Sequence, residues 1–206
     1  GSTAFSAATD TVSLTVTSRN DQPTTTSNVT LSAFTEDITT PNGVVISSLS
    51  TSFGYSDATD NQTSGNTVNI IGGNTSTSFS YLAVVGSTNY VSGQGVWQIS
   101  KTASPNASTA SDWVDVPTSG LSTTAALIFG SDSQIRFVPA ANYFGTPGTL
   151  TVRLADDSVN LSSSVTTSSS TKYDITNSTY GGTGTTNAWS SVDRTIGTTV
   201  TGVNDA

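Results

Sequence analysis

Alternation of apolar and polar residues at period two recurs along the chain, which is typical of β-strands with one buried face. Residues 11–17 and 29–33 alternate strictly. Shorter apolar runs predict further strands at residues 44–46, 68–71, 79–85, 96–99, 113–116, 127–129, 135–137 and 150–154. Turn-forming Gly, Pro and Asn separate these runs, and no stretch shows a capped helical period. We therefore predict an all-β fold, an antiparallel β-sandwich with long polar loops.

Two polar stretches are longer than ordinary turns, at residues 101–112 and 157–188. Loops of this length in compact domains tend to be functional or disordered. Within the second stretch, residues 165–173 have an alternative interpretation as a weak strand.

The chain also contains an internal repeat, because residues 4–22 recur without a gap at residues 188–206, 184 positions later. The identical pairs are Ala4/Ala188, Ser6/Ser190, Thr11/Thr195, Thr15/Thr199, Val16/Val200, Thr17/Thr201, Asn20/Asn204 and Asp21/Asp205. Such self-similarity is the signature of a tandem array of modules. We interpret residues 1–22 as the closing strand of a preceding module plus a junction, and residues 23–206 as one complete module.

Composition narrows the range of partners. The chain has no Cys, Met or His, and its 14 acidic residues outnumber its 6 basic ones, for a net charge of -8. This charge balance disfavours nucleic acid and anionic lipid as partners. No apolar run approaches the ~20 residues of a membrane span, so we expect no membrane insertion. Without disulfides, a secreted β-rich protein needs another source of rigidity, and bound calcium is a common one.

Carboxylates cluster where strands end or turn. Asn20-Asp21 stands at the junction and returns as Asn204-Asp205. The other clusters are Glu36-Asp37, Asp57 with Asp60, and Asp156-Asp157. Calcium takes six to eight oxygen ligands, which such clusters supply. For any single cluster, a role in turn formation is an equally good explanation, but the set as a whole favours metal binding.

Several motifs follow one another in an order that resembles a known family. They are Thr35-Glu36-Asp37, Tyr55 to Asp60, Gly95 to Ser100, Asp112-Trp113, Ala126 to Ile128, Arg136 to Pro139, Asn142 to Thr146, Val152 to Asp156 and Val203 to Ala206. This order resembles the cadherin-like modules of giant bacterial surface adhesins of the RTX type, which are exported by type I secretion. The resemblance covers most of residues 20–206. Lys101 departs from it, since Asp or Gly is commoner there.

The resemblance implies a cadherin- or immunoglobulin-like sandwich of Greek-key type, located outside the cell on a bacterial surface. It implies that Ca²⁺ rigidifies the junctions between neighbouring modules of the same chain. The candidate ligands it implies are Asp21, Glu36, Asp57, Asp60, Asp156 and Asp205. We expect the chain to be monomeric.

Other conspicuous side chains have structural explanations. Arg136 can bind a ligand carboxylate, but pairing with a nearby Asp is the favoured interpretation. Trp97 and Trp113 are expected to be core or sheet-packing aromatics. Trp189 aligns with Phe5 in the repeat and is expected to anchor the closing strand from inside.

Catalysis is disfavoured, because a chain without His and Cys lacks the usual general base and the strongest nucleophile. A pair of Asp residues can hydrolyse a glycoside in principle, but no motif singles out one pair. We expect no enzymatic activity.

Two functions remain. The favoured one is a calcium-dependent adhesin module that binds a peptide or glycan on another cell surface through its loops, and the alternative is a passive spacer. A plain spacer gains nothing from long polar loops, whereas a binder gains contact area. The candidate ligand-binding residues are Asp157, Tyr173 and Tyr180, because they combine a carboxylate with aromatic side chains in one long loop.

Overall fold

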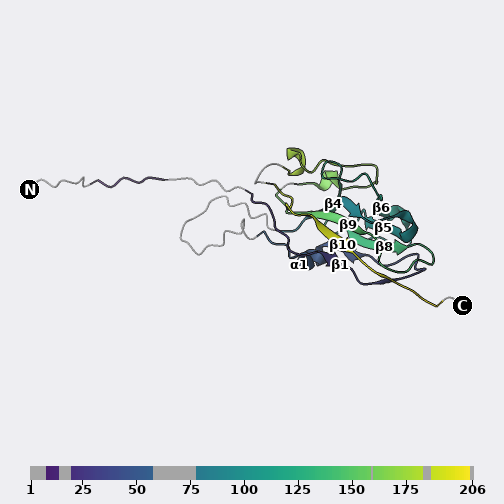
Figure 1. The fold of residues 1–206 in the computed structure, drawn as a ribbon. Helices are drawn as coiled ribbons and strands as arrows, with labels where there is room; N and C mark the ends of the chain where they lie inside the picture. The colour runs from purple at the N-terminus through teal and green to yellow at the C-terminus, as the bar shows by residue number, and fades with distance from the viewer. Residues whose placement is uncertain (1–7, 14–19, 58–77, 159, 183–186, 205–206) are drawn as a thin grey trace, which may run out of the picture.

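The strands of the molecule form two main β-sheets (Figure 1). A computed structural model of the chain describes residues 8–13, 20–57, 78–158, 160–182 and 187–204. Within these residues the structure is mostly β with little helix, which confirms the all-β prediction in the form of a sandwich-like fold. The predicted strand at residues 68–71 lies outside the described residues.

The larger sheet has five strands in the order β1-β10-β9-β4-β7, and the smaller has four in the order β3-β8-β5-β6. The five strands are β1 (Val29–Thr30), β10 (Arg194–Gly197), β9 (Thr149–Ala155), β4 (Tyr81–Thr88) and β7 (Leu127–Gly130). The four are β3 (Val44–Val45), β8 (Gln134–Pro139), β5 (Gly95–Ser100) and β6 (Trp113–Asp115). A separate pair joins β11 (Val200–Thr201) to β2 (Phe34–Thr35).

Strand pairing is antiparallel within the two sheets except at one edge. There β1 runs parallel to β10, and β2 runs parallel to β11 a few residues further on. The first two strands, β1 and β2, therefore lie beside the last two, β10 and β11, and point the same way. Residues 20–24 lie at one end, called here the proximal end, and residues 200–204 extend from the opposite, distal end (Figure 1).

The main core fills the space between the two sheets. Trp97 of β5 and Phe137 of β8 pack edge to face with ring centroids 5.2 Å apart, and neither is exposed. The other members with no exposed surface are Ile46, Phe53, Leu82, Val84, Ile99, Leu127, Phe129, Ile135, Leu150, Val152, Leu154 and Ile196. Trp113 is also buried, so both tryptophans are core aromatics as predicted.

The five-stranded sheet buries its outer face as well. A second apolar cluster lies there, formed by Ala83, Val85, Ala126, Ile128, Ala155, Leu161, Ile175, Ala188 and Trp189. Its cover is the described part of the chain between β9 and β10, which we call the cover segment (residues 157–190 except 159 and 183–186). Residues 165–173 form no strand, and Tyr173 makes a single bridge with Ala126.

One predicted strand is shorter than expected and gives way to helix. The apolar run at 44–46 ends as a strand at Val45, and a 3-10 helix (Ile46–Leu49) and one α-helical turn, α1 (Ser50–Phe53), follow. Ile46, Leu49 and Phe53 are buried, at a spacing that puts them on one helical face. This helical period was missed. The other 3-10 helices are Ser92–Gln94, Ala110–Asp112, Ser162–Ser164 and Ser178–Tyr180.

The prediction that Arg136 pairs with an Asp was wrong. Its Nε donates to Gln98 Oε1, and its Nη1 donates to the carbonyls of Pro41 and Ala107, each at 2.9 Å. The guanidinium also stacks on the Trp113 ring, 3.7 Å from the centroid. Burial lowers the pKa of Arg136, because desolvation disfavours the charged form. Carbonyl dipoles and an aromatic face contact the guanidinium directly. The charge of Asp115, which forms no ion pair with Arg136, partly offsets the lowering of its pKa.

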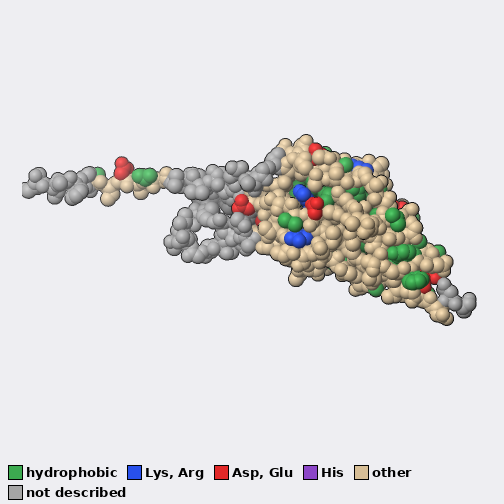
Figure 2. Space-filling model, viewed as in Figure 1, with side chains coloured by type: hydrophobic (Ala, Val, Ile, Leu, Met, Phe, Trp, Pro, Cys, Tyr) green, Lys and Arg blue, Asp and Glu red, His purple; other side chains and the backbone are tan. Residues whose placement is uncertain are grey.

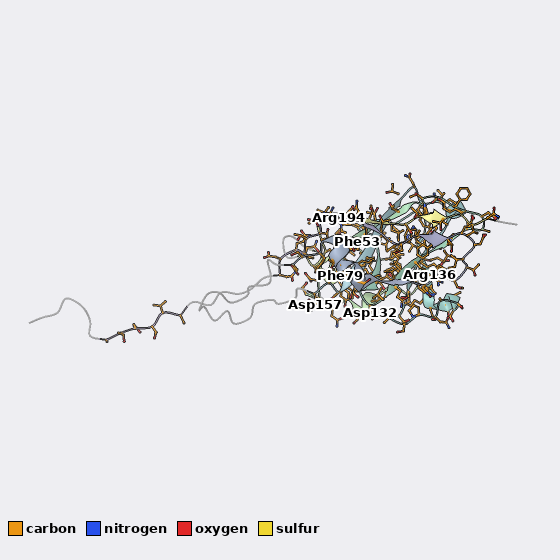
Figure 3. The ribbon with its side chains drawn as sticks, turned by 90° about the horizontal axis from the view of Figure 1, so that it is seen from below. Phe53, Phe79, Asp132, Arg136, Asp157 and Arg194 are labelled. Atoms are coloured by element: carbon orange, nitrogen blue, oxygen red, sulfur yellow. The ribbon has the colours of Figure 1, made fainter. Side chains whose placement is uncertain are left out.

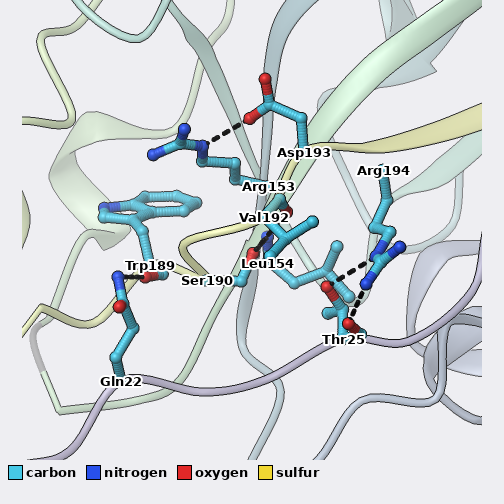
Figure 4. A network of polar contacts seen from close by, with 9 residues as sticks. All are labelled: Gln22, Thr25, Arg153, Leu154, Trp189, Ser190, Val192, Asp193 and Arg194. Atoms are coloured by element: carbon cyan, nitrogen blue, oxygen red, sulfur yellow. Dashed lines mark hydrogen bonds and ion pairs between the residues drawn. The ribbon is translucent and has the colours of Figure 1, made fainter.

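A network of polar contacts joins residues 22–25 to residues 189–194, where the chain approaches and enters β10 (Figure 4). Gln22 Nε2 donates to the Trp189 carbonyl at 2.6 Å, and Arg194 donates from Nε to Thr25 Oγ1 at 3.0 Å and from Nη2 to the Thr25 carbonyl. Next to it, Arg153 pairs with Asp193 at 2.7 Å. Segments more than 160 residues apart in sequence are thereby joined at the proximal end.

The surface is mostly uncharged. Figure 2 shows backbone and uncharged polar side chains over most of one face, with scattered acidic and basic groups. Residues 8–13, which precede the sandwich, are exposed and form no strand. Among the described residues, no helix combines the length and apolar character needed to cross a membrane.

Candidate functional site

At the proximal end, the buried carboxylate of Asp156 follows β9 directly. It has no exposed surface, and it accepts hydrogen bonds from Asn20 Nδ2 at 3.1 Å and from the Ser158 amide at 2.8 Å. Burial raises the pKa of Asp156, although the hydrogen bonds from Ser158 and Asn20 partly offset this shift. The first residue of the Asn-Asp junction is thus in contact with the carboxylate that ends β9.

Two further candidate ligands reach the same end. Thr24 and Ser56 form an antiparallel bridge, with amide-to-carbonyl distances of 2.7 and 2.9 Å. This bridge brings the segment that contains Asp57 beside the segment that follows Asp21. The Asp57 side chain is buried and Asp21 is partly buried. The Asp21 carbonyl accepts a hydrogen bond from Asn20 Nδ2 at 3.1 Å. Asp21, Asp57 and Asp156 therefore belong to one end of the sandwich.

Glu36 lies at the distal end. Its side chain is buried, and Oε1 accepts a hydrogen bond from the Val203 amide at 2.5 Å, just before Asn204. The Glu36 amide donates to the Thr201 carbonyl at 3.0 Å, which continues the β2–β11 pairing. Beside it, Asp37 adopts a left-handed backbone conformation (φ 63°) and accepts from the Asn142 amide at 3.0 Å.

The structure thus places Asp21, Asp57 and Asp156 at the proximal end, where Asn20 contacts Asp156, and Glu36 at the distal end, where it contacts Val203 next to Asn204. Asp60 and Asp205 lie outside the described residues. Within the described ranges, no three Asp, Glu, His or Cys side chains converge as a metal-binding group.

The candidate ligand-binding residues have different surroundings from one another. Asp157 is exposed and lies at the proximal end (Figure 3). Tyr173 and Tyr180 are partly buried against the second apolar cluster, with their rings edge to face at 5.3 Å. The Tyr180 carbonyl accepts a hydrogen bond from Trp189 Nε1 at 2.6 Å. Both tyrosines help to hold the cover segment on the sheet.

Sequence reasoning missed two polar grooves that meet at Lys101. One lies between the start of β4, the β7–β8 turn and the cover segment, and the other lies between β5, β6 and the cover segment. Their walls come from segments far apart in the sequence, so no local motif marks them. The one signal in the sequence is Lys101, because it stands where Asp or Gly is commoner in the adhesin modules that the sequence resembles.

Comparison of the chain with protein-family models, with curated proteins and with solved structures finds no match.

Proposed function

We propose that this chain is a calcium-dependent module of a large bacterial surface adhesin, located outside the cell and acting in attachment rather than catalysis. The observation that carries the proposal is that a candidate ligand lies at or next to the repeated Asn-Asp segment at both ends. Asn20 binds Asp156 at the proximal end, and Glu36 binds the Val203 amide beside Asn204 at the distal end.

The sequence repeat suggests how the candidate ligands at the two ends could form one calcium site between neighbouring modules. Because Asn204-Asp205 corresponds to Asn20-Asp21, a following module would place its own equivalents of Asp57 and Asp156 beside that second junction. Glu36 of one module and Asp57 and Asp156 of the next would then share one Asn-Asp segment. Such a shared segment would collect oxygens from two modules, and calcium takes six to eight oxygen ligands.

The donor chemistry fits calcium better than other metals. Carboxylates, amide oxygens and backbone carbonyls are the ligands that hard cations prefer, and the chain has no Cys or His to favour a softer metal. A cation would also offset the cost of keeping the fully buried Asp156 charged. Bound calcium supplies positive charge that holds the acidic ends of adjacent modules together.

Within this role we favour binding of a peptide or glycan on another cell surface, with Asp157, Tyr173 and Tyr180 as candidate contacts. The grooves beside Lys101 support binding, because they offer concave polar surface next to the cover segment. One observation supports the spacer alternative: Tyr173 and Tyr180 pack into the second cluster, so this part of the loop serves as structure.

Thermal unfolding of the 206-residue chain with calcium and with a chelator tests the metal role. At a calcium concentration 100 times Kd we expect a stabilisation of about 2.7 kcal/mol. For a domain of this size that corresponds to a rise in Tm of roughly 5–10 °C. Asp156→Asn is expected to remove most of the rise, because it removes a buried carboxylate at the proximal end.

Asp10→Asn is the matched control, since it makes the same charge change at an exposed residue outside the sandwich. It is expected to leave the calcium effect unchanged. Equal melting temperatures with calcium and with the chelator would refute the proposed metal role.

A further inference from the structure

Lys101 differs from the other described cations in having no partner. Arg136, Arg153, Lys172 and Arg194 each donate to a named oxygen. Among the described residues, no hydrogen bond or ion pair engages the Lys101 ammonium. A lysine ammonium has three donors, and here all three are available to a ligand.

The first groove has a volume of about 380 Å³ and brings Lys101 together with hydroxyl groups and a carboxylate. Ser80 and Ser162 contribute from the start of β4 and from the cover segment, and Ser131, Asp132 and Ser133 form the turn between β7 and β8. Hydroxyls both donate and accept, and a carboxylate accepts only. This mixture matches a ligand that itself carries several hydroxyl groups.

The second groove lies on the other side of Lys101 and measures about 300 Å³. Its walls include Gln98 and Asp115, which are hydrogen-bonded to each other at 2.7 Å, and the hydroxyl residues 167–169 of the cover segment. Volumes of this order are at the lower end of those of small-molecule sites. Lys101 lines both grooves, so a ligand in either groove would meet the same ammonium group.

Charge decides which hydroxyl-bearing ligand fits. Each groove has one carboxylate in its wall, Asp132 or Asp115, and the chain carries a net charge of -8. An anionic ligand is disfavoured, because the negative charge of the protein would repel it even though Lys101 would attract it. A neutral ligand instead receives hydrogen bonds from Lys101 and donates hydrogen bonds to Asp132 or Asp115. Such charge-assisted bonds are the stronger kind.

An aromatic group adds the remaining feature. Tyr81 lines the first groove, with its hydroxyl held by the Leu161 amide at 3.1 Å. A ring beside hydroxyls suits a sugar, because a sugar has apolar C–H faces as well as polar edges. We propose that the surface on both sides of Lys101 binds a short neutral saccharide. This inference names the ligand class for the attachment role proposed above.

The test is a titration of the isotope-labelled 206-residue protein, followed by backbone amide NMR shifts. The probes are methyl glucoside, methyl galactoside, methyl mannoside and N-acetylglucosamine, with galacturonate as the acidic counterpart. At least one neutral sugar is expected to shift the amides of Lys101, residues 130–133 and residues 167–169. Lys101→Ala is expected to weaken that binding about tenfold or more, since it removes a charged hydrogen-bond donor.

Lys172→Ala is the matched control, because Lys172 donates to the Gly120 carbonyl and lines neither groove. It loses the same charge and is expected to leave sugar affinity unchanged. Binding of galacturonate alone, or equal losses in the two variants, would overturn the assignment of a neutral saccharide to Lys101. No shift with any probe would overturn the proposed site.

The same titration in calcium and in chelator separates the two proposals. If calcium fails to stabilise the chain while a sugar still binds at Lys101, the proposed calcium role is refuted and the proposed saccharide site is supported. If calcium stabilises the chain and no sugar binds, the groove proposal falls and the spacer function is favoured.

Discussion

The two faces of the five-stranded sheet are both buried but are covered in different ways. On the inner face, Leu82, Phe129 and Leu154 pack against regular strands of the other sheet. On the outer face, Ile128 and Ala155 are covered by the cover segment, which contributes only short 3-10 helices and single bridges. A strand layer is held by its whole ladder of backbone bonds, whereas the cover segment depends on a few specific contacts.

Those contacts can be named. The Ile128 amide donates to Thr166 Oγ1 at 2.9 Å, and the Thr166 amide donates to the Ile128 carbonyl at 2.6 Å. Tyr173 and Ala126 exchange two backbone hydrogen bonds at 2.8 and 2.9 Å. Elements with fewer stabilising contacts open at lower free energy than the global value. We therefore expect the inner face to govern global unfolding and the outer face to open first.

The largest expected effects on stability come from replacing two buried tryptophans, one at each face of the five-stranded sheet. Trp97 of the main core and Trp189 of the cover segment are both fully buried. The Nε1 of Trp97 donates to the Gly148 carbonyl at 2.8 Å, and that of Trp189 donates to the Tyr180 carbonyl at 2.6 Å. Trp97→Ala is expected to cost about 3–5 kcal/mol of global stability, because it leaves a large cavity. Trp189→Ala is expected to cost less globally, because the cover segment can loosen without unfolding the sandwich.

Urea unfolding measures the global losses, and amide hydrogen exchange measures local opening. Trp189→Ala is expected to speed exchange across residues 160–182 while β5 and β8 stay protected. An equal global loss for both variants, with uniform exchange, would show that the two faces unfold as one unit.

A smaller effect is expected at Gly182, where the cover segment passes close to itself. A Cβ at this position would lie 1.8 Å from the Ile175 carbonyl oxygen. Gly182→Ala is therefore expected to displace the segment at a cost of about 1–3 kcal/mol, measured by urea unfolding. Gly93→Ala is the control, because a Cβ there meets no atom within 4 Å. Similar losses in both variants would argue against the close approach at Gly182.

The smallest effect concerns the tyrosine pair. The edge-to-face contact of Tyr173 and Tyr180 is expected to contribute about 0.5–1.5 kcal/mol beyond burial of the rings. A double-mutant cycle of Tyr173→Leu and Tyr180→Leu measures this coupling by urea unfolding. A coupling near zero, with additive single losses, would show that each ring contributes through its own burial alone.

The main features of the fold were readable from the sequence, because alternation marks half-buried strands. The consecutive apolar residues of β7, Leu127 to Phe129, predicted a strand, and the structure buries them on both faces of the sheet. They did not indicate what covers the second face, since the cover segment is rich in Ser and Thr and buries only a few widely spaced residues. The short helix at Ile46–Phe53 was missed for a related reason, because its apolar period spans barely two turns.

Only the part of the candidate site that lies next to the repeated Asn-Asp segments was predictable from the sequence. The paired Asn-Asp segments predicted a junction at each end, and they lead to Asp156 at one end and Glu36 at the other. The partners of Arg136 were not predictable, because two of its acceptors are backbone carbonyls of loops remote in sequence. The grooves at Lys101 were not predictable either, since their walls are assembled by the tertiary fold.

The parallel pairing of first and last strands has a mechanical consequence. Amides of Leu31, Phe34 and Glu36 donate to the carbonyls of Gly197, Thr199 and Thr201 at 2.8–3.0 Å. The chain enters the sandwich at the proximal end and leaves it at the distal end (Figure 1), so tension between these ends acts along the paired strands. These bonds are then loaded in shear and share the force, rather than breaking one after another as in a peeled hairpin. The seam between the two strands is thus oriented to resist stretching.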